Sequence, residues 1–538
     1  MDAAGRAIYG DKAEASIPRI KYGAGYVQNI RSFNFDTGSK YFLHILNNSQ
    51  PESIKPDLNI LVPSIFENRL SLLIIVLICS GIIFSAGTTT LPMDAHEVFV
   101  VQTTQEMHDR GNWLVPWFND QPRLKKPPLN YWLTGAAAWL SRSLDNIQPW
   151  HGRVISVMAG LAMLSLIYLL GLRLYNGRIA TLSVLVLATS LGLFTYSHDA
   201  RPDMLYAFLC TAGYVAFTLA LYSQKNFNKK ILIYVMWAAY GLATLSKGPH
   251  MPAIYLLASL MFCFIRRMSW HEIINLIKPV TGLILFSLLT VPWWYNLNLE
   301  LGGARLHETQ LSGSLFAINF FNLFNFYYFY RPLLLLLPWA IFLPYTVKHI
   351  MSEKQYAGGN QLLLLYLLLP VLVLSIGNQQ RWFYMLPSIV PAGLLLAAGV
   401  NIFIADLKQR FNLVLISTLV LGIAFAIAGY THTGWSKDRF EYYNLAIRAH
   451  DLAKNDPVII IGVNPDIYVY YTGVGIKQIK NPDEIVDLFQ TSIHNRVYAI
   501  INYRNIESLP GSLNYTILHK TASLDSKSIA LIMLERKT

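Results

Sequence analysis

The chain has 538 residues, of which 54% are hydrophobic and 14% are charged, and its formal net charge is +12. A soluble globular protein carries about a quarter charged residues, and the apolar residues here gather into runs close to the ~20 residues of a bilayer-crossing helix. A soluble protein is therefore excluded, and the basic residues, which lie between the apolar runs, do not form a nucleic-acid-binding patch.

The first 69 residues are polar and contain no hydrophobic region typical of a signal peptide. We expect residues 1–69 to be a cytoplasmic N-terminal extension that is poorly ordered. An overlong start-site assignment would explain the same segment equally well.

Apolar runs that can form membrane helices follow from residue 70 onward. They fall at 70–90, 129–141, 153–173, 178–196, 203–222, 231–246, 251–265, 276–297, 331–348, 361–376, 382–404 and 411–430. The run at 129–141 is short for a crossing, so it is either re-entrant or interfacial, or it pairs with a second span near 145–160. The sequence predicts 11 to 13 transmembrane helices.

Basic loops between these runs predict the orientation of the chain. They lie at 173–178, 225–230, 266–267, 348–354 and 408–410. Lys and Arg in short loops mark the cytoplasmic side, so the first long loop, 91–128, and everything after residue 430 are expected outside. The N-terminus is predicted inside and the C-terminus outside.

The composition changes after the last apolar run. Residues 436–538 are charged and carry short β-branched runs at 458–461, 497–501 and 529–533, with helical stretches between them. Strands that alternate with helices favour a small α/β domain. We predict an extracytoplasmic α/β domain over 436–538 that serves as a lid or support for a catalytic membrane domain over 70–435.

The first outer loop contains two acids that can perform acid–base chemistry. Asp94 and Glu97 are three residues apart, so a helix that begins there places both on one face. Asp94 can instead be the N-cap of a helix that runs to about Asp109. Beside them, His96 is interpreted as a polar neighbour, with a metal-ligand role as the alternative.

Basic residues gather on the predicted outer side, where the positive-inside rule discourages them. Lys125 and Lys126 precede two prolines, and Arg201, Lys247 and Arg381 lie in other outer loops. Cations at a membrane boundary are costly and usually functional, and together they can grip a lipid-linked phosphate. The alternatives are interfacial snorkelling for the two lysines and, for Arg201, an ion pair with a nearby acid such as Asp199.

No metal or cofactor site is predicted from the spacing of ligand residues. Cys79, Cys210 and Cys263 each lie inside an apolar run, which supports neither a disulfide framework nor a zinc site. No cofactor is expected to be required, although a divalent metal remains compatible with the sequence.

Several motifs, in this order, resemble those of the GT-C integral-membrane glycosyltransferases of the 4-amino-4-deoxy-L-arabinose transferase and protein O-mannosyltransferase type. They are Asp94 to Glu97, Gln105 to Met107, Gly111 to Pro116, Lys125 to Trp132, Arg201 to Asp203, Ser246 to Gly248 and Tyr384 to Pro387. Two departures stand out: the contiguous acid pair is opened to Asp-Ala-His-Glu, and Lys125 replaces the acid before Lys-Pro-Pro. The resemblance covers about residues 70–430 and, more loosely, the outer C-terminal domain.

The resemblance implies a GT-C fold and an inverting transfer of a sugar from a polyprenyl-phosphate donor, at the outer face of a bacterial inner membrane. The acceptor is a hydroxyl or phosphate of a lipid A-like glycolipid, another envelope glycan or a protein, and no nucleic acid is involved. It implies Asp94 as the general base with Glu97 second, and the following residues at the substrate and its phosphate: Lys125, Lys126, Arg201, Asp203, Lys247, Arg381 and Tyr384.

Two other functions fit the composition. A transporter or lipid flippase explains the number of spans and the charges near the membrane, but the apolar pattern shows no inverted repeat and the polar residues collect on one side. A non-catalytic relative, whose outer domain binds a partner, is compatible with the two altered motifs.

Overall fold

We describe a computed structural model of the chain. It describes residues 69–302, 326–377, 380–404, 408–431, 437–454, 456–473, 476–479, 483–491, 496–521 and 528–537. The predicted N-terminal extension lies almost entirely outside these residues, so its order and location stay predictions.

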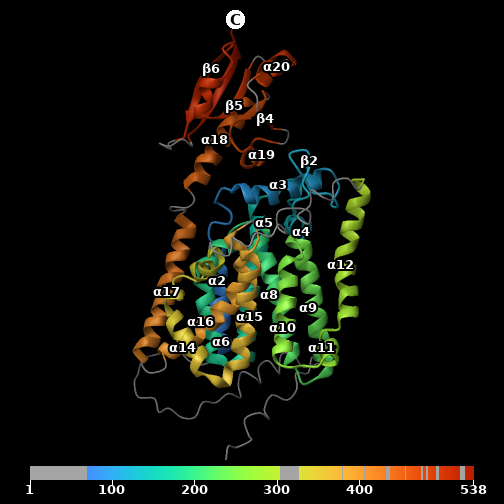
Figure 1. Cartoon of the computed structure of the whole chain (residues 1–538). Helices are drawn as coiled ribbons and strands as arrows, with labels where there is room; N and C mark the ends of the chain where they lie inside the picture. Colours follow the sequence, from blue (N-terminus) through green and yellow to red (C-terminus); the bar gives the residue numbers. More distant parts are fainter. Residues whose placement is uncertain are drawn as a thin grey trace, which may run out of the picture. The chain divides into compact units, whose positions relative to one another are not determined.

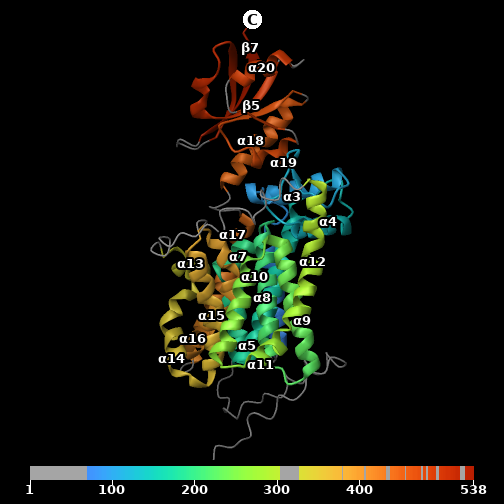
Figure 2. The same cartoon turned by 45° about the vertical axis from the view of Figure 1, so that its right-hand side comes forward.

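The apolar runs form helices with nearly the predicted limits (Figures 1 and 2). The bundle consists of α2 (Arg69–Ser85), α5 (Pro149–Leu174), α6 (Gly177–Ala188), α7 (Leu191–Ser197), α8 (Pro202–Leu221), α9 (Asn226–Lys247), α10 (His250–Ile265), α12 (Pro279–Glu300), α13 (Tyr327–Leu335), α14 (Leu343–Ser352), α15 (Ala357–Ser375), α16 (Ile389–Ile404) and α17 (Lys408–Thr431). The prediction of a polytopic helical membrane protein is confirmed.

Length and composition give a smaller number of crossings among the described helices than the sequence predicts. Five described helices are long and apolar enough to span a bilayer, and two bent pairs raise that number to seven. In these pairs, α6 and α7 meet at 57°, and α13 meets the helical segment 339–352 at 109°. The range of 11 to 13 spans therefore stays a prediction.

The short run at 129–141 forms α4 (Leu129–Leu140), which has 12 residues. At 1.5 Å per residue such a helix rises only ~18 Å, well short of the ~30 Å hydrocarbon core. Residues 149–174 form the single helix α5, so the second short span proposed near 145–160 is not seen. Of the two alternatives, the structure supports a re-entrant or interfacial α4.

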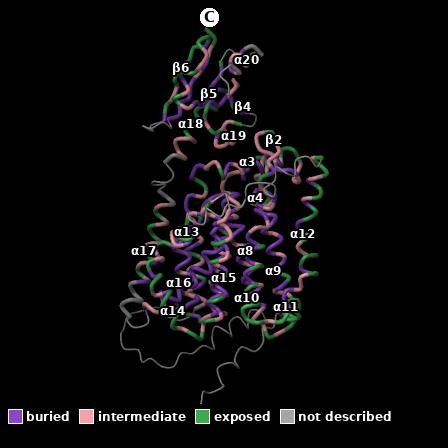
Figure 3. The backbone as a smooth tube through the Cα atoms, viewed as in Figure 1, coloured by how far each residue is buried: buried purple, intermediate pink, exposed green. Residues whose placement is uncertain are grey.

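The outer face of α12 is apolar and exposed, as expected for a surface that meets lipid. On α12, Val280, Leu288 and Leu299 are 70%, 67% and 61% exposed, and Figure 3 shows this helix as largely exposed beside the buried central helices. Inside the bundle, a Cβ on Gly213 of α8 would lie 2.1 Å from the ring of Tyr240 on α9. Glycine there lets the two helices approach closely.

The first long loop folds into α3 (Ala95–Asp109), a small hairpin of β1 (Trp117–Phe118) and β2 (Gln121–Pro122), and then α4. The predicted limits of α3 are confirmed. In Figure 1, α3 lies across one end of the helical bundle, while α11 (Trp270–Ile277) and α14 lie at the opposite end. The basic loops at 266–267 and 348–354 accompany α11 and α14.

The C-terminal segment forms the predicted small α/β domain. Its sheet has the order β4-β3-β5-β7-β6, in which β4, β3 and β5 are parallel and β7 pairs antiparallel with both β5 and β6. Helices α18 and α19 cover one face and α20 covers the other. The elements are α18 (Lys437–Ala453), β3 (Val458–Ile461), α19 (Asp466–Thr472), β4 (Lys477–Ile479), α20 (Asp483–Thr491), β5 (Arg496–Asn502), β6 (Leu513–Lys520) and β7 (Ile529–Arg536).

Candidate functional site

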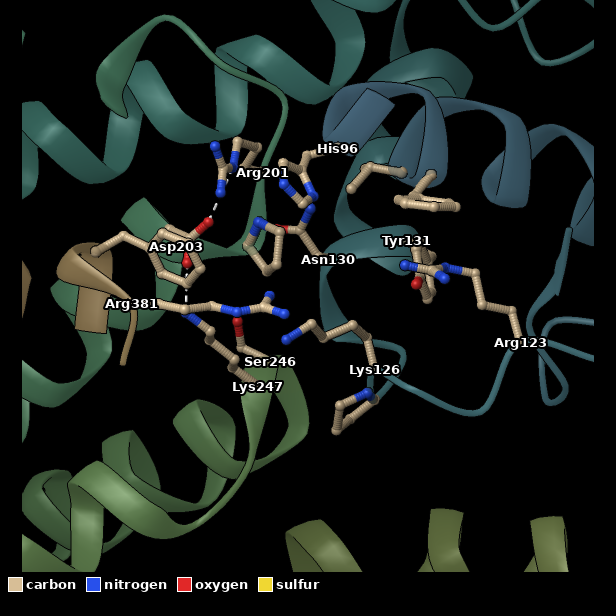
Figure 4. Close-up of a pocket in the computed structure, with 15 residues that line it drawn as sticks. His96, Arg123, Lys126, Asn130, Tyr131, Arg201, Asp203, Ser246, Lys247 and Arg381 are labelled. Atoms are coloured by element: carbon tan, nitrogen blue, oxygen red, sulfur yellow. Dashed lines mark hydrogen bonds and ion pairs between the residues drawn. The ribbon is translucent and has the colours of Figure 1, made fainter. Parts of the chain in front are cut away.

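A pocket joins five segments that are separate in the sequence (Figure 4). They are the start of α3, the loop before α4, the turns at the start of α8 and the end of α9, and the segment that begins the short helix η8 (Trp382–Ser388). The side chains that line the pocket are His96, Phe99, Val100, Arg123, Lys126, Pro127, Asn130, Tyr131, Arg201, Pro202, Asp203, Ser246, Lys247, Arg381 and Phe383.

Positive charge dominates this pocket. Among the described residues that line it, five are cationic and one is a carboxylate, Asp203. Asp203, Asn130 and Lys247 are buried, whereas His96 and Arg381 remain exposed at the rim. The buried residues form the inner end of the pocket, and its cations suit it to an anion that enters from the rim. Opposite charges attract each other more strongly where water is excluded.

The carboxylate of Asp203 fixes two of the cations. Arg201 donates from Nε to Asp203 at 3.0 Å, and the Lys247 ammonium forms an ion pair with the other carboxylate oxygen. Lys247 is the last residue of α9, and Gly248 ends the helix with φ of +120°, a conformation that side-chain-bearing residues rarely adopt. Asp203 therefore holds the two cations in place, and its predicted place at the substrate stays a prediction.

The ion pair with a nearby acid, which is the alternative interpretation of Arg201, is present, but the acid is Asp203 and not Asp199. Asp199 instead accepts a hydrogen bond at 3.2 Å from Arg439, in the C-terminal domain. Asp203 follows Arg201 by two residues, as far along the chain as Asp199 precedes it.

The ring of Phe383 lies among the cations. Lys247 Nζ is 4.5 Å from the ring centroid, and the guanidinium carbon atoms of Arg201 and Arg381 are 5.1 Å and 6.0 Å away. Tyr384 follows on η8 and places its ring 4.6 Å from the same ammonium. Tyr384 is buried and does not line the pocket, so its predicted hydrogen bond to substrate stays a prediction.

The two adjacent lysines have different environments. Lys126 lines the pocket, and Figure 4 shows its ammonium and the guanidinium of Arg381 reaching into the same space. Burial and the nearby charge of Lys247 lower the pKa of Lys126 well below its ordinary value, as expected for a cation beside other cations. Lys125 is exposed and does not line the pocket.

Asp94 caps α3, which confirms the alternative interpretation of Asp94 as the N-cap of this helix. Its Oδ1 accepts hydrogen bonds from the backbone N–H groups of His96 and Glu97 at 2.8 Å and 2.9 Å, and the Glu97 carboxylate accepts from the Asp94 N–H at 3.1 Å. This reciprocal pair is a capping box. Neither acid is among the residues that line the pocket.

Glu97 is fully buried in a network of charged hydrogen bonds. It accepts from Arg153 at 2.7 Å, from Arg439 at 2.9 Å and from the Ala200 N–H at 2.8 Å. Although burial acts in the opposite direction, Arg153 and Arg439 lower the pKa of Glu97 to about 2. A carboxylate held this firmly in its ionised form is a poor proton acceptor, which counts against Glu97 as the base.

Arg439 ties the C-terminal domain to the first loop. From α18 its guanidinium lies 3.5 Å from Asp94, 2.9 Å from Glu97 and 3.2 Å from Asp199. Tyr471 of α19 adds a hydrogen bond at 2.9 Å from the N–H of Met93. These contacts favour the supporting role predicted for the C-terminal domain.

Sequence reasoning missed several residues of this region. The sequence predicts His96 only as a polar neighbour or, alternatively, a metal ligand, and it assigns no role to Arg123, Asn130, Phe383 or Arg439. For His96 the signal was its place inside the altered acid motif. No sequence signal pairs Arg439 with Glu97, because 342 positions separate them.

Comparisons with known proteins give one family model and a group of relatives. The model described as dolichyl-phosphate-mannose-protein mannosyltransferase matches residues 125–295. An undecaprenyl phosphate-alpha-4-amino-4-deoxy-L-arabinose arabinosyl transferase from Erwinia tasmaniensis is 28% identical over 312 residues, 56% of this chain and 54% of that protein. A protein of the same name from Pectobacterium carotovorum is 25% identical and covers 61% of this chain and 60% of that protein. The chain thus spans little more than half the length of these curated relatives.

Solved structures share the fold over most of the chain. Apo ArnT from Cupriavidus metallidurans has a TM-score of 0.69 at 15% identity, covering 86% of this chain and 97% of that one. The same protein bound to undecaprenyl phosphate has a TM-score of 0.66. An oligosaccharyltransferase from Archaeoglobus fulgidus, in complex with Zn and sulfate, has a TM-score of 0.52 at 12% identity. The predicted fold class is confirmed.

Proposed function

We propose that this chain, a GT-C membrane protein of the arabinosyltransferase and O-mannosyltransferase type, is an inverting glycosyltransferase that uses a polyprenyl-phosphate sugar. The observation that carries the proposal is the cationic pocket, which gathers Lys126, Arg201, Lys247 and Arg381 from four segments around a buried floor. The names of the relatives and the undecaprenyl phosphate bound to the structural neighbour point to the same donor class.

The geometry supports a specific division of labour in the pocket. Lys126 and Arg381 converge on one space, so we assign them to the donor phosphate, whose charge grows as the bond to the sugar breaks. Fixed cations in a water-poor site stabilise such a leaving group in the transition state. Arg201 and Lys247, anchored by Asp203, raise the positive potential without having to move.

The reaction as proposed needs no nucleotide and no metal, because the leaving group is a lipid phosphate and the protein supplies its counter-charges. The acceptor attacks the anomeric carbon opposite the phosphate, which inverts the configuration. We propose an acceptor in the cell envelope, either a lipid A-like glycolipid, another glycan or a protein.

The chain is a multi-pass membrane protein, and we propose that it lies in a bacterial inner membrane with the pocket at the outer face. The support is that α3 and α4, which carry part of the pocket, lie at one end of the bundle. The helices that accompany two basic loops lie at the other end, the side that basic loops mark as cytoplasmic.

Transfer by the purified full chain tests the proposal. Radiolabelled polyprenyl-phosphate sugars would be offered with mixed envelope lipid as acceptor, with Lys126→Ala and Arg381→Ala variants alongside. We expect wild-type transfer that both variants largely lose. Movement of labelled lipid between liposome leaflets without transfer would establish a flippase instead, and donor binding with neither activity would establish a non-catalytic relative.

A further inference from the structure

We propose that His96 is the general base, the group that takes the proton from an acceptor hydroxyl. This inference rests on the proposed glycosyl transfer. It gives His96 the role of base, which the sequence motifs alone gave to Asp94 or Glu97.

Position singles out His96 among the acid–base groups of the first loop. Its ring lines the pocket and lies beside Arg201 and Asn130 in Figure 4. The Asp94 side chain instead turns back onto the start of α3, where its Oδ1 accepts two backbone N–H groups. Glu97 is buried behind Arg153 and Arg439.

The one carboxylate among the described lining residues, Asp203, is unsuited to accept a proton near neutral pH, and Lys126 and Arg381 are assigned to the phosphate. Asp203 is buried and bonded to both Arg201 and Lys247, so it stays ionised and committed. Among the described lining residues the remaining charged groups are cations. His96 is also exposed at the rim, where an acceptor that approaches from the membrane surface meets it.

The surroundings of His96 favour the neutral form of its ring, which can accept a proton. Desolvation and the guanidinium of Arg201 lower its pKa, Arg381 adds to this effect, and Asp94 and Asp203 oppose it. Arg123, Lys126 and Lys247 complete the charges of the pocket. A neutral imidazole has a free ring nitrogen, and a donor phosphate bound nearby would make that nitrogen more basic by offsetting the cations.

The step balances without any further reagent. A ring nitrogen of His96 takes the hydroxyl proton while the acceptor oxygen forms its bond to the anomeric carbon. The bond from that carbon to the phosphate oxygen breaks, and the phosphate leaves with the electron pair beside Lys126 and Arg381. The imidazolium then releases its proton to water before the next turnover.

The test compares His96→Asn, His96→Asp and Asp94→Asn with wild type in the transfer assay across pH. A matched control is His108→Asn, at the far end of the same helix, where His108 lies 3.3 Å from the exposed Asp145 and does not line the pocket. Binding of undecaprenyl phosphate to each variant reports whether the pocket is still intact.

We expect His96→Asn to lower kcat by about 10²- to 10⁴-fold with undecaprenyl phosphate binding unchanged. His96→Asp should keep partial activity, with the loss of activity at acid pH moved to lower pH because a carboxyl group titrates lower than imidazole. Asp94→Asn should retain more activity than His96→Asn, since Asn is also a good N-cap, and His108→Asn should match wild type.

Other results overturn the assignment in distinguishable ways. If wild type shows no transfer, the proposed function fails and the base assignment fails with it. If wild type transfers and His96→Asn does so at the same rate and with the same pH profile, only the base assignment fails. Loss of undecaprenyl phosphate binding in His96→Asn, or a greater loss of kcat in Asp94→Asn, also contradicts it.

Discussion

The two adjacent lysines before the Pro-Pro element allow a sharp test of phosphate binding, because only one of them lines the pocket. Lys126 and Arg381 reach into the same space, whereas Lys125 is exposed. A hydrogen bond to a charged group contributes ~1.5–3 kcal/mol, and every 1.4 kcal/mol is about tenfold in affinity. Lys126→Ala should therefore weaken binding of undecaprenyl phosphate by about 10- to 150-fold.

Lys125→Ala is the matched comparison, with the same loss of formal charge one residue away. Interactions between exposed charges contribute at most ~1 kcal/mol, so its effect should stay below about fivefold. Titration of each variant in one detergent with fluorescent or radiolabelled undecaprenyl phosphate gives the dissociation constants. Equal losses in the two variants, or a larger loss for Lys125→Ala, would refute the placement of the phosphate beside Lys126.

Three further predictions follow from the charges of the site. Because the pKa of Lys126 is lowered, undecaprenyl phosphate binding should be intact below that pKa and lost as pH rises through it. This loss should occur at a lower pH than an ordinary lysine would give. The Lys126→Arg variant stays charged and should retain binding at alkaline pH. Arg439→Ala, which breaks a buried ionic network, should cost about 3–5 kcal/mol of stability, seen as a lower unfolding midpoint in detergent. Asp203→Asn should destabilise the protein by leaving two buried cations unbalanced, and the double variant Asp203→Asn/Lys247→Met should recover part of the loss.

Each of these has an outcome that contradicts it. An alkaline binding profile unchanged by Lys126→Arg would show that Lys126 does not titrate in the bound range. Arg496→Ala, which removes an exposed ion pair and should cost less than ~1 kcal/mol, is the control for Arg439→Ala, and equal unfolding midpoints in the two would refute the role of Arg439. A double variant less stable than Asp203→Asn would show that Lys247 is not the unbalanced charge.

Local sequence patterns were enough to predict the helices and the C-terminal domain. The apolar runs gave the limits of helices such as α5 and α8 within a few residues, because an apolar run long enough to cross a bilayer can only satisfy its backbone as a helix. In the C-terminal domain, the alternation of β-branched runs with polar helical stretches predicted the sheet of 436–538, because this pattern too is local in the sequence.

The gathering of cations on one side of the bundle could also be predicted, although its geometry could not. Cations on the predicted outer side needed an explanation, and Lys126, Arg201, Lys247 and Arg381 do line one pocket. Which of the two adjacent lysines lines the pocket depends on the path of the chain into α4. The sequence places the Pro-Pro element before α4 but does not give that path.

The choice among Asp94, His96 and Glu97 lay beyond the sequence. Successive residues on a helix point about 100° apart, so a pattern that places acids near a site cannot say which residue faces it. The N-cap role of Asp94 turns that side chain back onto α3. Glu97 is held by a hydrogen bond from Arg439, which reaches it from the C-terminal domain.

The most direct test of the account is a cryo-electron microscopy map of the full chain bound to undecaprenyl phosphate in lipid nanodiscs. We predict phosphate density between the Lys126 ammonium and the Arg381 guanidinium, with Arg201 and Lys247 still held by Asp203. Phosphate density outside this pocket, with the lipid head group away from Lys126 and Arg381, would contradict it.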